Sequence, residues 1–239
     1  MSYRPDFYNP LQYNVAKQRW LIRRFPGLED IQVNHSQLHQ DMFVLCVLDG
    51  LRGGSYLDIG AHEPLFINNT ALLEQQFGWR GLSVELSAPH VQRHHAMRRN
   101  PCLLADATTL DYRAALAEAG LGPVIDYLSL DTDPPEVTLR ALDQLPHGDV
   151  RFRVITFEHD LSAGGEAVRR LSRERLHALG YELVVADVAW GHRVVEDWWV
   201  APELTDPAVV AQMRCVDGAA HDHQTYICGG YRVPQRVAA

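Results

Sequence analysis

The stretch Ser55-Tyr-Leu-Asp-Ile-Gly-Ala-His62, followed by Gly81-Leu-Ser-Val-Glu85, decides the fold of this 239-residue chain. Each segment is a short apolar run with a carboxylate at or near its end, Asp58 in the first and Glu85 in the second. Gly60 stands directly behind the first run and suits a tight turn. In an open α/β sheet, this pattern places a glycine turn and an acid at the carboxyl ends of neighbouring strands, where nucleotide-type ligands bind.

Apolar runs and amphipathic stretches alternate along the rest of the chain. Strands are expected at residues 55–59, 81–85, 102–105, 125–130, 152–158 and 181–187, and helices at 69–77, 88–99, 112–119, 136–145 and 166–179. A further extended run, 194–200, is expected to form a hairpin with 181–187 and to supply an antiparallel edge. Continuous apolar strands indicate a parallel sheet that is covered on both faces. The sequence therefore predicts an α/β fold with a doubly wound, Rossmann-like, mostly parallel seven-stranded sheet and an antiparallel edge strand.

Two regions are expected along the chain. Residues 1–35 lack a sustained period and are interpreted as an N-terminal helical arm, and residues 36–239 are expected to form the main domain. An arm of this kind can pack on its own domain or on a second subunit, so a homodimer is a possible assembly. Arg93, Arg98 and Arg99 fall on one predicted helix and are interpreted as a solvated face.

Charge and cysteine content narrow the class of protein. The formal net charge of -8 argues against a general nucleic-acid partner, because phosphate contacts need a basic surface. The N-terminus lacks the apolar region of a signal peptide, and no apolar run approaches the roughly 18 residues of a membrane span. The four cysteines show no CxxC spacing, so we expect a reduced, cytoplasmic protein without a membrane partner.

The turn after the first strand bears on the type of cofactor. A dinucleotide fingerprint needs two further glycines, and Gly60-Ala-His-Glu-Pro-Leu-Phe66 has neither of them. Glu63 would also place a negative charge near a pyrophosphate. Glu85 and Asp106 at the ends of the next two strands extend the series of acids that Asp58 begins. A cofactor with no phosphate and a sulfonium cation suits such a turn, so we expect S-adenosyl-L-methionine.

Several runs resemble the FkbM-type S-adenosylmethionine-dependent methyltransferases over roughly residues 36–202. They are Tyr56-Leu-Asp-Ile-Gly-Ala-His-Glu-Pro64, Asn68-Asn-Thr70, Phe77-Gly-Trp-Arg-Gly-Leu-Ser-Val-Glu85 and Glu196-Asp-Trp-Trp-Val-Ala-Pro202. The resemblance implies a class I methyltransferase fold, in which Glu85 grips the ribose hydroxyls and Asp106 flanks the adenine. The cofactor-binding set that it implies is Asp58, Gly60, Ala61, His62, Asn69, Thr70, Glu85, Leu86, Asp106 and Ala107. Asn68 and Asn69 are equally suited to cap the following helix.

Two acidic clusters, Asp131-Thr-Asp133-Pro-Pro-Glu136 and Glu158-His159-Asp160, follow later strands and are expected to face the same crevice. Two arrangements remain open for the chemistry. In the first, Mg²⁺ or another divalent ion is held by Asp131, Glu158 and His159 and activates a hydroxyl. In the second, His159 acts as the general base beside a carboxylate, with Asp131 as a further catalytic residue. Asp133 and Asp160 are also suited to cap helices.

The expected function is methyl transfer from S-adenosylmethionine to a hydroxyl of a sugar or other small metabolite. The alternatives are an amine, carboxyl or glycan acceptor, or a catalytically silent interaction module. Cys215, His221, His223 and Cys228 supply metal-type ligands within a short window. The absence of a paired CxxC, and a short strand expected at 224–229, argue against a zinc site there.

Overall fold

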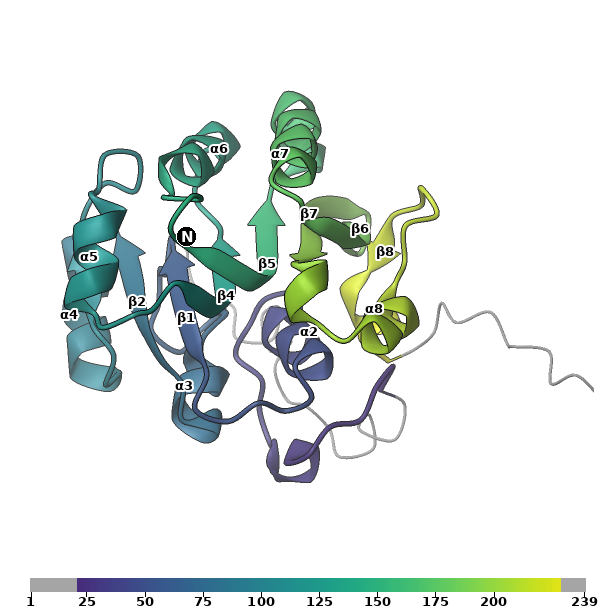
Figure 1. The fold of residues 1–239 in the computed structure, drawn as a ribbon, viewed down its shortest axis with the longest axis horizontal. Helices are drawn as coiled ribbons and strands as arrows, with labels where there is room; N and C mark the ends of the chain where they lie inside the picture. Colours follow the sequence, from purple (N-terminus) through teal and green to yellow (C-terminus); the bar gives the residue numbers. More distant parts are fainter. Residues whose placement is uncertain (1–20, 229–239) are drawn as a thin grey trace, which may run out of the picture.

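The computed structural model of the chain describes residues 21–228, which fold around a single mixed sheet (Figure 1). Its strands are β1 Ser55–Ile59, β2 Arg80–Glu85, β3 Cys102–Leu104, β4 Val124–Leu130, β5 Arg151–Glu158, β6 Glu182–Trp190, β7 Arg193–Val200 and β8 His221–Asp222. The α-helices are α2 Gln40–Val47, α3 Ala71–Phe77, α4 Ala88–Met97, α5 Tyr112–Glu118, α6 Pro135–Gln144, α7 Glu166–Ala178, α8 Pro207–Met213 and α9 His223–Ile227. Short 3₁₀ helices lie at η2 Leu28–Asp30, η3 Leu161–Ala163 and η4 Pro202–Leu204.

The order of the sheet is β3-β2-β1-β4-β5-β7-β6-β8. Strands β3, β2, β1, β4 and β5 pair in parallel, and β7 pairs antiparallel with both β5 and β6. The predicted α/β, Rossmann-like and mostly parallel sheet is therefore confirmed. The strand order reverses between β1 and β4, because the chain returns from β3 at the edge to β4 beside β1. Ligands of such folds bind at this switch point.

Two details of the predicted sheet differ from the structure. The hairpin of β6 and β7 forms as expected, but the antiparallel strand β7 lies between β5 and β6 rather than at the edge. Inserting β7 there lets its backbone pair on both sides. The edge is instead β8, an additional strand that pairs in parallel with β6. Residues 224–227, which were expected to form a strand, belong to helix α9.

Helices cover both faces of the sheet because consecutive strand residues point to opposite sides. Trp198 packs in a core with residues of η2, α2, α3, α8 and α9, whereas its neighbour Trp199 packs in a second core with residues of α5, α6 and α7. Leu28 and Ile31, within the predicted arm, are buried in the first of these cores. The remainder of the predicted arm, residues 1–20, lies outside the described residues. No helix in the described part of the chain is both long enough and apolar enough to span a membrane.

Candidate functional site

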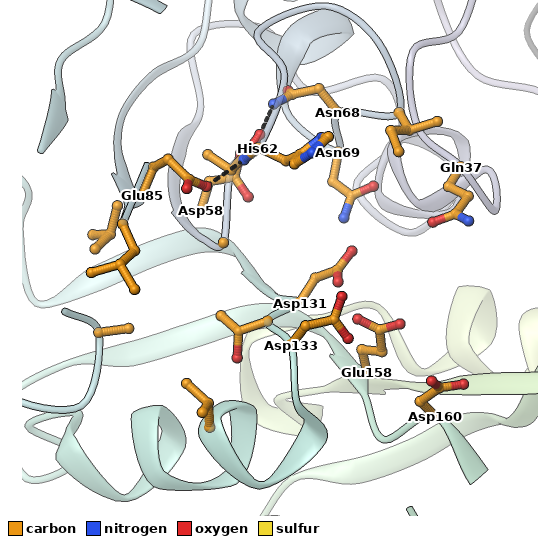
Figure 2. Close-up of a pocket in the computed structure, with 18 of the residues that line it drawn as sticks. Gln37, Asp58, His62, Asn68, Asn69, Glu85, Asp131, Asp133, Glu158 and Asp160 are labelled. Carbon is orange, nitrogen blue, oxygen red and sulfur yellow. Dashed lines mark hydrogen bonds between the residues drawn. The ribbon is translucent and has the colours of Figure 1, made fainter. Parts of the chain in front are cut away.

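A cavity of about 500 Å³ opens at the carboxyl ends of β1, β2, β4 and β5 (Figure 2). This volume lies within the usual range of small-molecule sites. The predicted site residues that line it are Asp58, Gly60, Ala61, His62, Asn69, Glu85, Leu86, Asp106, Ala107, Asp131 and Glu158. Two predicted residues, Thr70 and His159, are fully buried and do not line the cavity.

The turn after β1 requires glycine for a steric reason. Gly60 has a φ of 86°, and a Cβ added at this position would lie 1.7 Å from the carbonyl oxygen of Asp131. The backbone N–H of Gly60 donates to the carbonyl oxygen of Val84 at 2.9 Å. The ends of β1, β2 and β4 can therefore converge around this residue because it carries no side chain.

Glu85 connects the loops that follow β1 and β2. One carboxylate oxygen accepts a hydrogen bond from the backbone N–H of His62 at 2.8 Å, and the other accepts from the N–H of Ser87 at 2.7 Å. A carboxylate has about four acceptor positions, so both oxygens can still receive hydroxyl donors. The exposed side chain of Leu86 and the methyl group of Ala107 provide apolar surface beside this carboxylate.

The next acid in the series, Asp106, also faces the cavity but belongs to a solvent-exposed turn. Its Oδ1 accepts hydrogen bonds from the backbone N–H and the hydroxyl of Thr108 at 2.8 and 2.7 Å. These bonds lower the pKa of Asp106. The carboxylate therefore stays ionised and keeps its turn in one conformation at the rim of the cavity.

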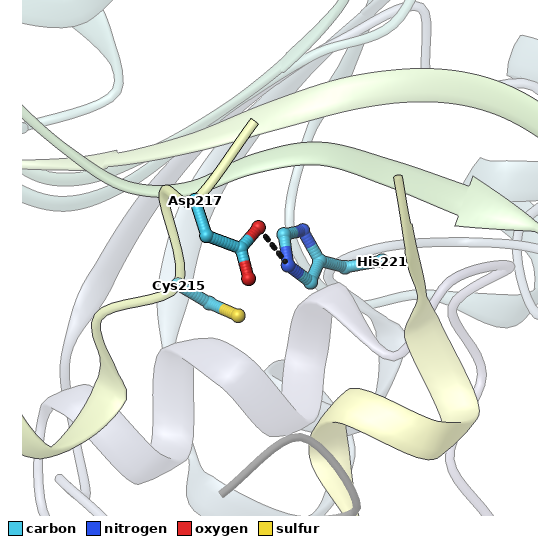
Figure 3. Close-up of side chains that lie close together, drawn as sticks. All are labelled: Cys215, Asp217 and His221. Carbon is cyan, nitrogen blue, oxygen red and sulfur yellow. Dashed lines mark ion pairs between the residues drawn. The ribbon is translucent and has the colours of Figure 1, made fainter. Parts of the chain in front are cut away.

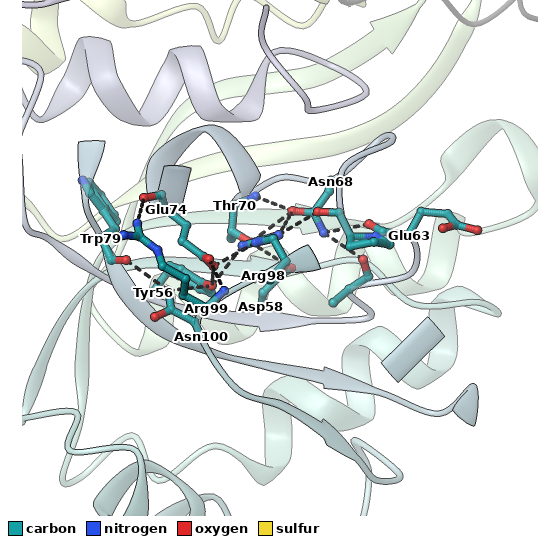
Figure 4. Close-up of polar contacts among 12 residues, drawn as sticks. Tyr56, Asp58, Glu63, Asn68, Thr70, Glu74, Trp79, Arg98, Arg99 and Asn100 are labelled. Carbon is teal, nitrogen blue, oxygen red and sulfur yellow. Dashed lines mark hydrogen bonds and ion pairs between the residues drawn. The ribbon is translucent and has the colours of Figure 1, made fainter. Parts of the chain in front are cut away.

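Asp58 rests on a buried polar cluster behind the cavity, shown in Figure 4. Its Oδ2 accepts a hydrogen bond from the Thr70 hydroxyl at 2.8 Å, and Nη2 of Arg98 donates to the same hydroxyl at 3.1 Å. Burial raises the pKa of Asp58 to about 6, against the bond from Thr70 and the attraction of Arg98. Thr70 therefore positions the Asp58 carboxylate and does not itself line the cavity.

Arg98 is the residue of this site that sequence reasoning missed. Its side chain is 1% exposed, and it donates to Glu74 Oε2 at 2.8 Å and to the Tyr56 hydroxyl at 3.0 Å. It also donates to Asn68 Oδ1 at 2.9 Å. We call Arg98 and these partners the arginine network.

The solvated helix face expected for Arg98 is wrong because α4 ends one residue earlier. Arg98 has an extended backbone, with φ -117° and ψ 154°, and this directs its side chain toward the sheet. No pattern in one sequence links it to Glu74, 24 positions away.

Asn68 and Asn69 have different roles in the loop before α3. Asn68 Nδ2 donates to the carbonyl oxygens of Ala61 and Glu63 at 2.9 and 3.1 Å, and so holds the turn after β1. Asn69 lines the cavity, and its Nδ2 donates to the Ser129 hydroxyl at 3.0 Å. The buried Oδ1 of Asn69 has no hydrogen-bond partner among the described residues, so it can accept a hydrogen bond from a ligand.

Carboxyl groups dominate the other half of the cavity, where Asp131, Asp133, Glu158 and Asp160 face its interior (Figure 2). Burial raises the pKa of Asp131 and raises that of Glu158 well above its usual value. The negative charge of Asp131 and a hydrogen bond between the two groups raise the pKa of Glu158 further. We call Asp131 and Glu158 the carboxyl pair; the raised pKa of Glu158 favours its protonated form, which can donate a hydrogen bond to Asp131.

Glu196 is a further buried acid behind this half of the cavity. It lies opposite Glu158 in the antiparallel β5–β7 ladder and accepts a hydrogen bond from Trp198 Nε1 at 2.6 Å. Burial raises the pKa of Glu196 to about 8, and the bond from Trp198 opposes this shift. Arg193 is the one Arg or Lys side chain among the residues described as lining the cavity, and its Nη2 lies 3.7 Å from Asp160 Oδ1. This half of the cavity therefore carries more acids than bases.

His159 points away from the cavity, although its neighbours Glu158 and Asp160 line it. Its Nε2 lies 3.5 Å from Asp197 Oδ1, and its Nδ1 accepts a hydrogen bond from the N–H of Leu161 at 3.3 Å. Burial acts to raise the pKa of Asp197, but bonds from Arg173 and His159 hold it well below its usual range. The structure therefore places His159 in a buried ion-pair network, out of reach of a substrate in the cavity.

The predicted metal ligands do not come together. Asp131 and Glu158 share the cavity, whereas His159 does not reach it. Among residues 21–228, the groups of three potential ligands within 4.8 Å of one another are His159–Asp187–Asp197 and Cys215–Asp217–His221. The carboxylates of the first group already accept bonds from Arg169 and Arg173. The predicted ligand set of Asp131, Glu158 and His159 is therefore not assembled at the cavity.

Comparisons with known proteins bear on the fold. No protein-family model matches the chain, and no curated protein matches its sequence. A solved structure named as an rRNA methylase, from Clostridium thermocellum, is 11% identical and covers 71% of this chain and 97% of its own, with a TM-score of 0.50. A TehB-like S-adenosylmethionine-dependent methyltransferase from Corynebacterium glutamicum is 16% identical over 67% of this chain and 86% of its own, with a TM-score of 0.42. The first of these likenesses shows the fold alone: the chain has the architecture of the class I methyltransferases.

Proposed function

We propose that this chain is an S-adenosylmethionine-dependent methyltransferase that methylates a hydroxyl of a sugar or other small metabolite. One observation carries the proposal: a single cavity joins the acids that end β1 and β2 to the carboxyl pair that follows β4 and ends β5. A donor site and a proton acceptor are both needed for methyl transfer to oxygen, and the cavity offers them side by side. The FkbM-type motifs of the sequence support the same assignment.

The residues at the ends of β1 and β2 fit the proposed cofactor. When bound, S-adenosylmethionine supplies a reactive methyl group on a positively charged sulfur. The Asp58 side of the cavity is acidic and suits that charge. Glu85 has acceptor positions left for ribose hydroxyls, and Leu86 with Ala107 offers apolar surface for an adenine ring.

The carboxyl pair is suited to act as the general base. While Glu158 keeps its proton, Asp131 is the acceptor in the pair and can take the proton that a hydroxyl loses when its oxygen is methylated. Burial raises the pKa of Asp131, which brings it closer to neutral pH and makes it a stronger base than a solvated carboxylate. Asn69 Oδ1 can accept a hydrogen bond from a second hydroxyl of the same substrate. No step of this chemistry needs a metal.

The charge of the cavity bears on the class of acceptor. Four acidic side chains against one arginine repel phosphates and carboxylates, so an uncharged, hydroxyl-rich acceptor suits the cavity. An amine acceptor is the second candidate, because the same excess of acids attracts a cationic nitrogen. A catalytically silent module is the third, and it predicts that the protein binds no S-adenosylmethionine.

The test combines product analysis with two variants. Wild-type protein is incubated with methyl-labelled S-adenosylmethionine and a panel of sugars, polyols and amines, and the bond to the labelled carbon is identified by mass spectrometry and NMR. Asp131→Asn should lower turnover by roughly 10²–10⁴-fold, the usual contribution of a general base, because its amide cannot accept the proton. Binding of S-adenosylhomocysteine, measured by calorimetry, should stay nearly unchanged in this variant.

Each outcome separates the candidates. Wild-type turnover in Asp131→Asn would rule out the carboxyl pair as the base. A labelled nitrogen in the product would favour the amine acceptor. Failure of wild-type protein to bind S-adenosylmethionine or S-adenosylhomocysteine would favour the catalytically silent module.

A further inference from the structure

A second cluster of reactive side chains lies at the β8 edge of the sheet, where Cys215, Asp217 and His221 face one another (Figure 3). One ligand atom of each residue lies within 4.8 Å of the other two. None of the three lines the cavity described above, and the proposed methyl transfer does not use them.

The backbone fixes two of these residues on the same strand. The N–H of Cys215 donates to the carbonyl oxygen of Val184 at 2.7 Å, and the N–H of Ala186 donates to the carbonyl oxygen of Cys215 at 3.0 Å. His221 begins β8 and pairs with Val188. Both residues are thus attached to β6, whose backbone sets their separation before any ligand binds.

The hydrogen bonding of His221 directs one ring nitrogen into the cluster. Its Nδ1 lies 3.0 Å from the carbonyl oxygen of Ala186, and because a carbonyl only accepts, this nitrogen carries the hydrogen. The lone pair of a neutral ring is then on Nε2, which lies 3.0 Å from Asp217 Oδ1. A lone pair and a carboxylate oxygen at this distance need a cation between them, either a proton or a metal ion. A backbone carbonyl that holds the far nitrogen is the usual support of a metal-binding histidine.

We propose that Cys215 Sγ, the Asp217 carboxylate and His221 Nε2 bind a zinc ion that fastens the segment 215–222 to β6. A thiolate, an imidazole and a carboxylate supply three of the four ligands of a tetrahedral Zn²⁺ ion, whereas Mg²⁺ and Ca²⁺ prefer oxygen ligands alone. His221 is 1% exposed, whereas the side chain of Asp217 is 67% exposed. Solvent therefore reaches the cluster from the Asp217 side, where water can complete the coordination.

The proposal departs from the sequence-based expectation, which was against a zinc site formed by Cys215, His221, His223 and Cys228. The structure brings Cys215 and His221 together with Asp217, and His223 and Cys228 do not belong to this group. The β6 backbone, not a paired CxxC motif, brings these residues into range.

The experiment titrates full-length, chelator-treated protein with Co²⁺ and then displaces the cobalt with Zn²⁺. Wild-type protein should bind one equivalent and show a thiolate-to-cobalt charge-transfer band, together with the strong visible bands of tetrahedral Co²⁺. Zinc should abolish both and should raise the melting temperature, because a ligand that binds only the folded state stabilises it. In Cys215→Ser the charge-transfer band should disappear, and in Asp217→Asn the affinity should fall by at least the roughly 10–100-fold that loss of an outer-shell partner costs.

Cys228→Ser is the matched control, because Cys228 is the other partly buried cysteine in this part of the chain and lies outside the cluster. It should keep the band and the affinity. Absence of a charge-transfer band in the wild type, or its loss in Cys228→Ser but not in Cys215→Ser, would overturn the proposal. Asp217→Asn changes an exposed side chain, so it reports on binding even where Cys215→Ser fails to fold.

Discussion

Glu74 is a buried acid and Glu158 a half-buried one, both close to the central strands, but their pKa values shift in opposite directions. Glu74 lies 2.8 Å from the guanidinium of Arg98, and burial, which would raise its pKa, is outweighed so that the pKa falls below its usual value. Glu158 has burial, Asp131 and Glu196 around it, and its pKa is raised well above the usual value. The difference is one buried cation.

This contrast distinguishes residues that support the fold, in the arginine network, from residues that are suited to chemistry, in the carboxyl pair. In the arginine network each charge has a partner, so the network holds Tyr56, Asn68 and Thr70 in fixed positions behind Asp58. The carboxyl pair keeps unbalanced charge next to a cavity, which costs stability. Carboxyl groups with strongly raised pKa values in a cleft are frequent at functional sites.

The largest expected loss of stability comes from removing the buried guanidinium of Arg98. Arg98→Met keeps much of the side-chain volume but leaves Glu74 as an uncompensated buried charge. Breaking a buried pair in this way should lower the free energy of unfolding by about 3–5 kcal/mol, measured by urea denaturation. A loss below about 1 kcal/mol would show that the arginine network does not support the fold.

A second prediction concerns how the free energy of unfolding depends on pH through the buried acid Glu196. Because the folded-state pKa of Glu196 is raised from 4.5 to about 8, its stabilisation is complete below pH 4.5 and is lost as the pH rises toward 8. Glu196→Gln keeps an acceptor for Trp198 and removes this titration. Between pH 5 and 7, the unfolding free energy of the wild type should fall relative to the variant by on the order of 2–3 kcal/mol. Parallel pH profiles for the two proteins would contradict the raised pKa of Glu196.

A third prediction concerns the half of the cavity proposed to bind the cofactor, which lies between the arginine network and the carboxyl pair. Glu85→Ala should weaken S-adenosylhomocysteine binding by roughly 10- to 150-fold in calorimetry, because charge-assisted hydrogen bonds contribute about 1.5–3 kcal/mol. Glu63→Gln is the control, since Glu63 pairs with Arg93 and does not line the cavity. Equal losses in both variants would indicate that the loop, and not the Glu85 carboxylate, governs binding.

The smallest effect is expected at the surface. Arg93 lies on the same helix as the residues that lead to Arg98, but its side chain is 43% exposed and pairs with Glu63. Arg93→Met should change the free energy of unfolding by less than about 1 kcal/mol in the same urea experiment. A loss as large as that of Arg98→Met would remove the distinction between buried and exposed arginines on which the comparison depends.

Much of the fold and half of the site follow from local patterns. Strand and helix positions are set by apolar periodicity, and Asp58, Glu85 and Asp131 follow from their places at or just after strand ends. His159 shows where this reasoning fails. Successive residues at the end of β5 point in different directions, so Glu158 and Asp160 line the cavity while the histidine between them is buried in an ion-pair network.

Local sequence patterns are sufficient to predict the alternating architecture and the line of acids along one rim of the sheet, because both depend on neighbours a few residues apart. Which of the buried charges are balanced depends on the three-dimensional packing. Arg98 meets Glu74 and Thr70, and Cys215 meets His221, through pairings of distant strands and helix ends that no local period encodes. Burial then sets the pKa of each acid according to whether a cation shares its space.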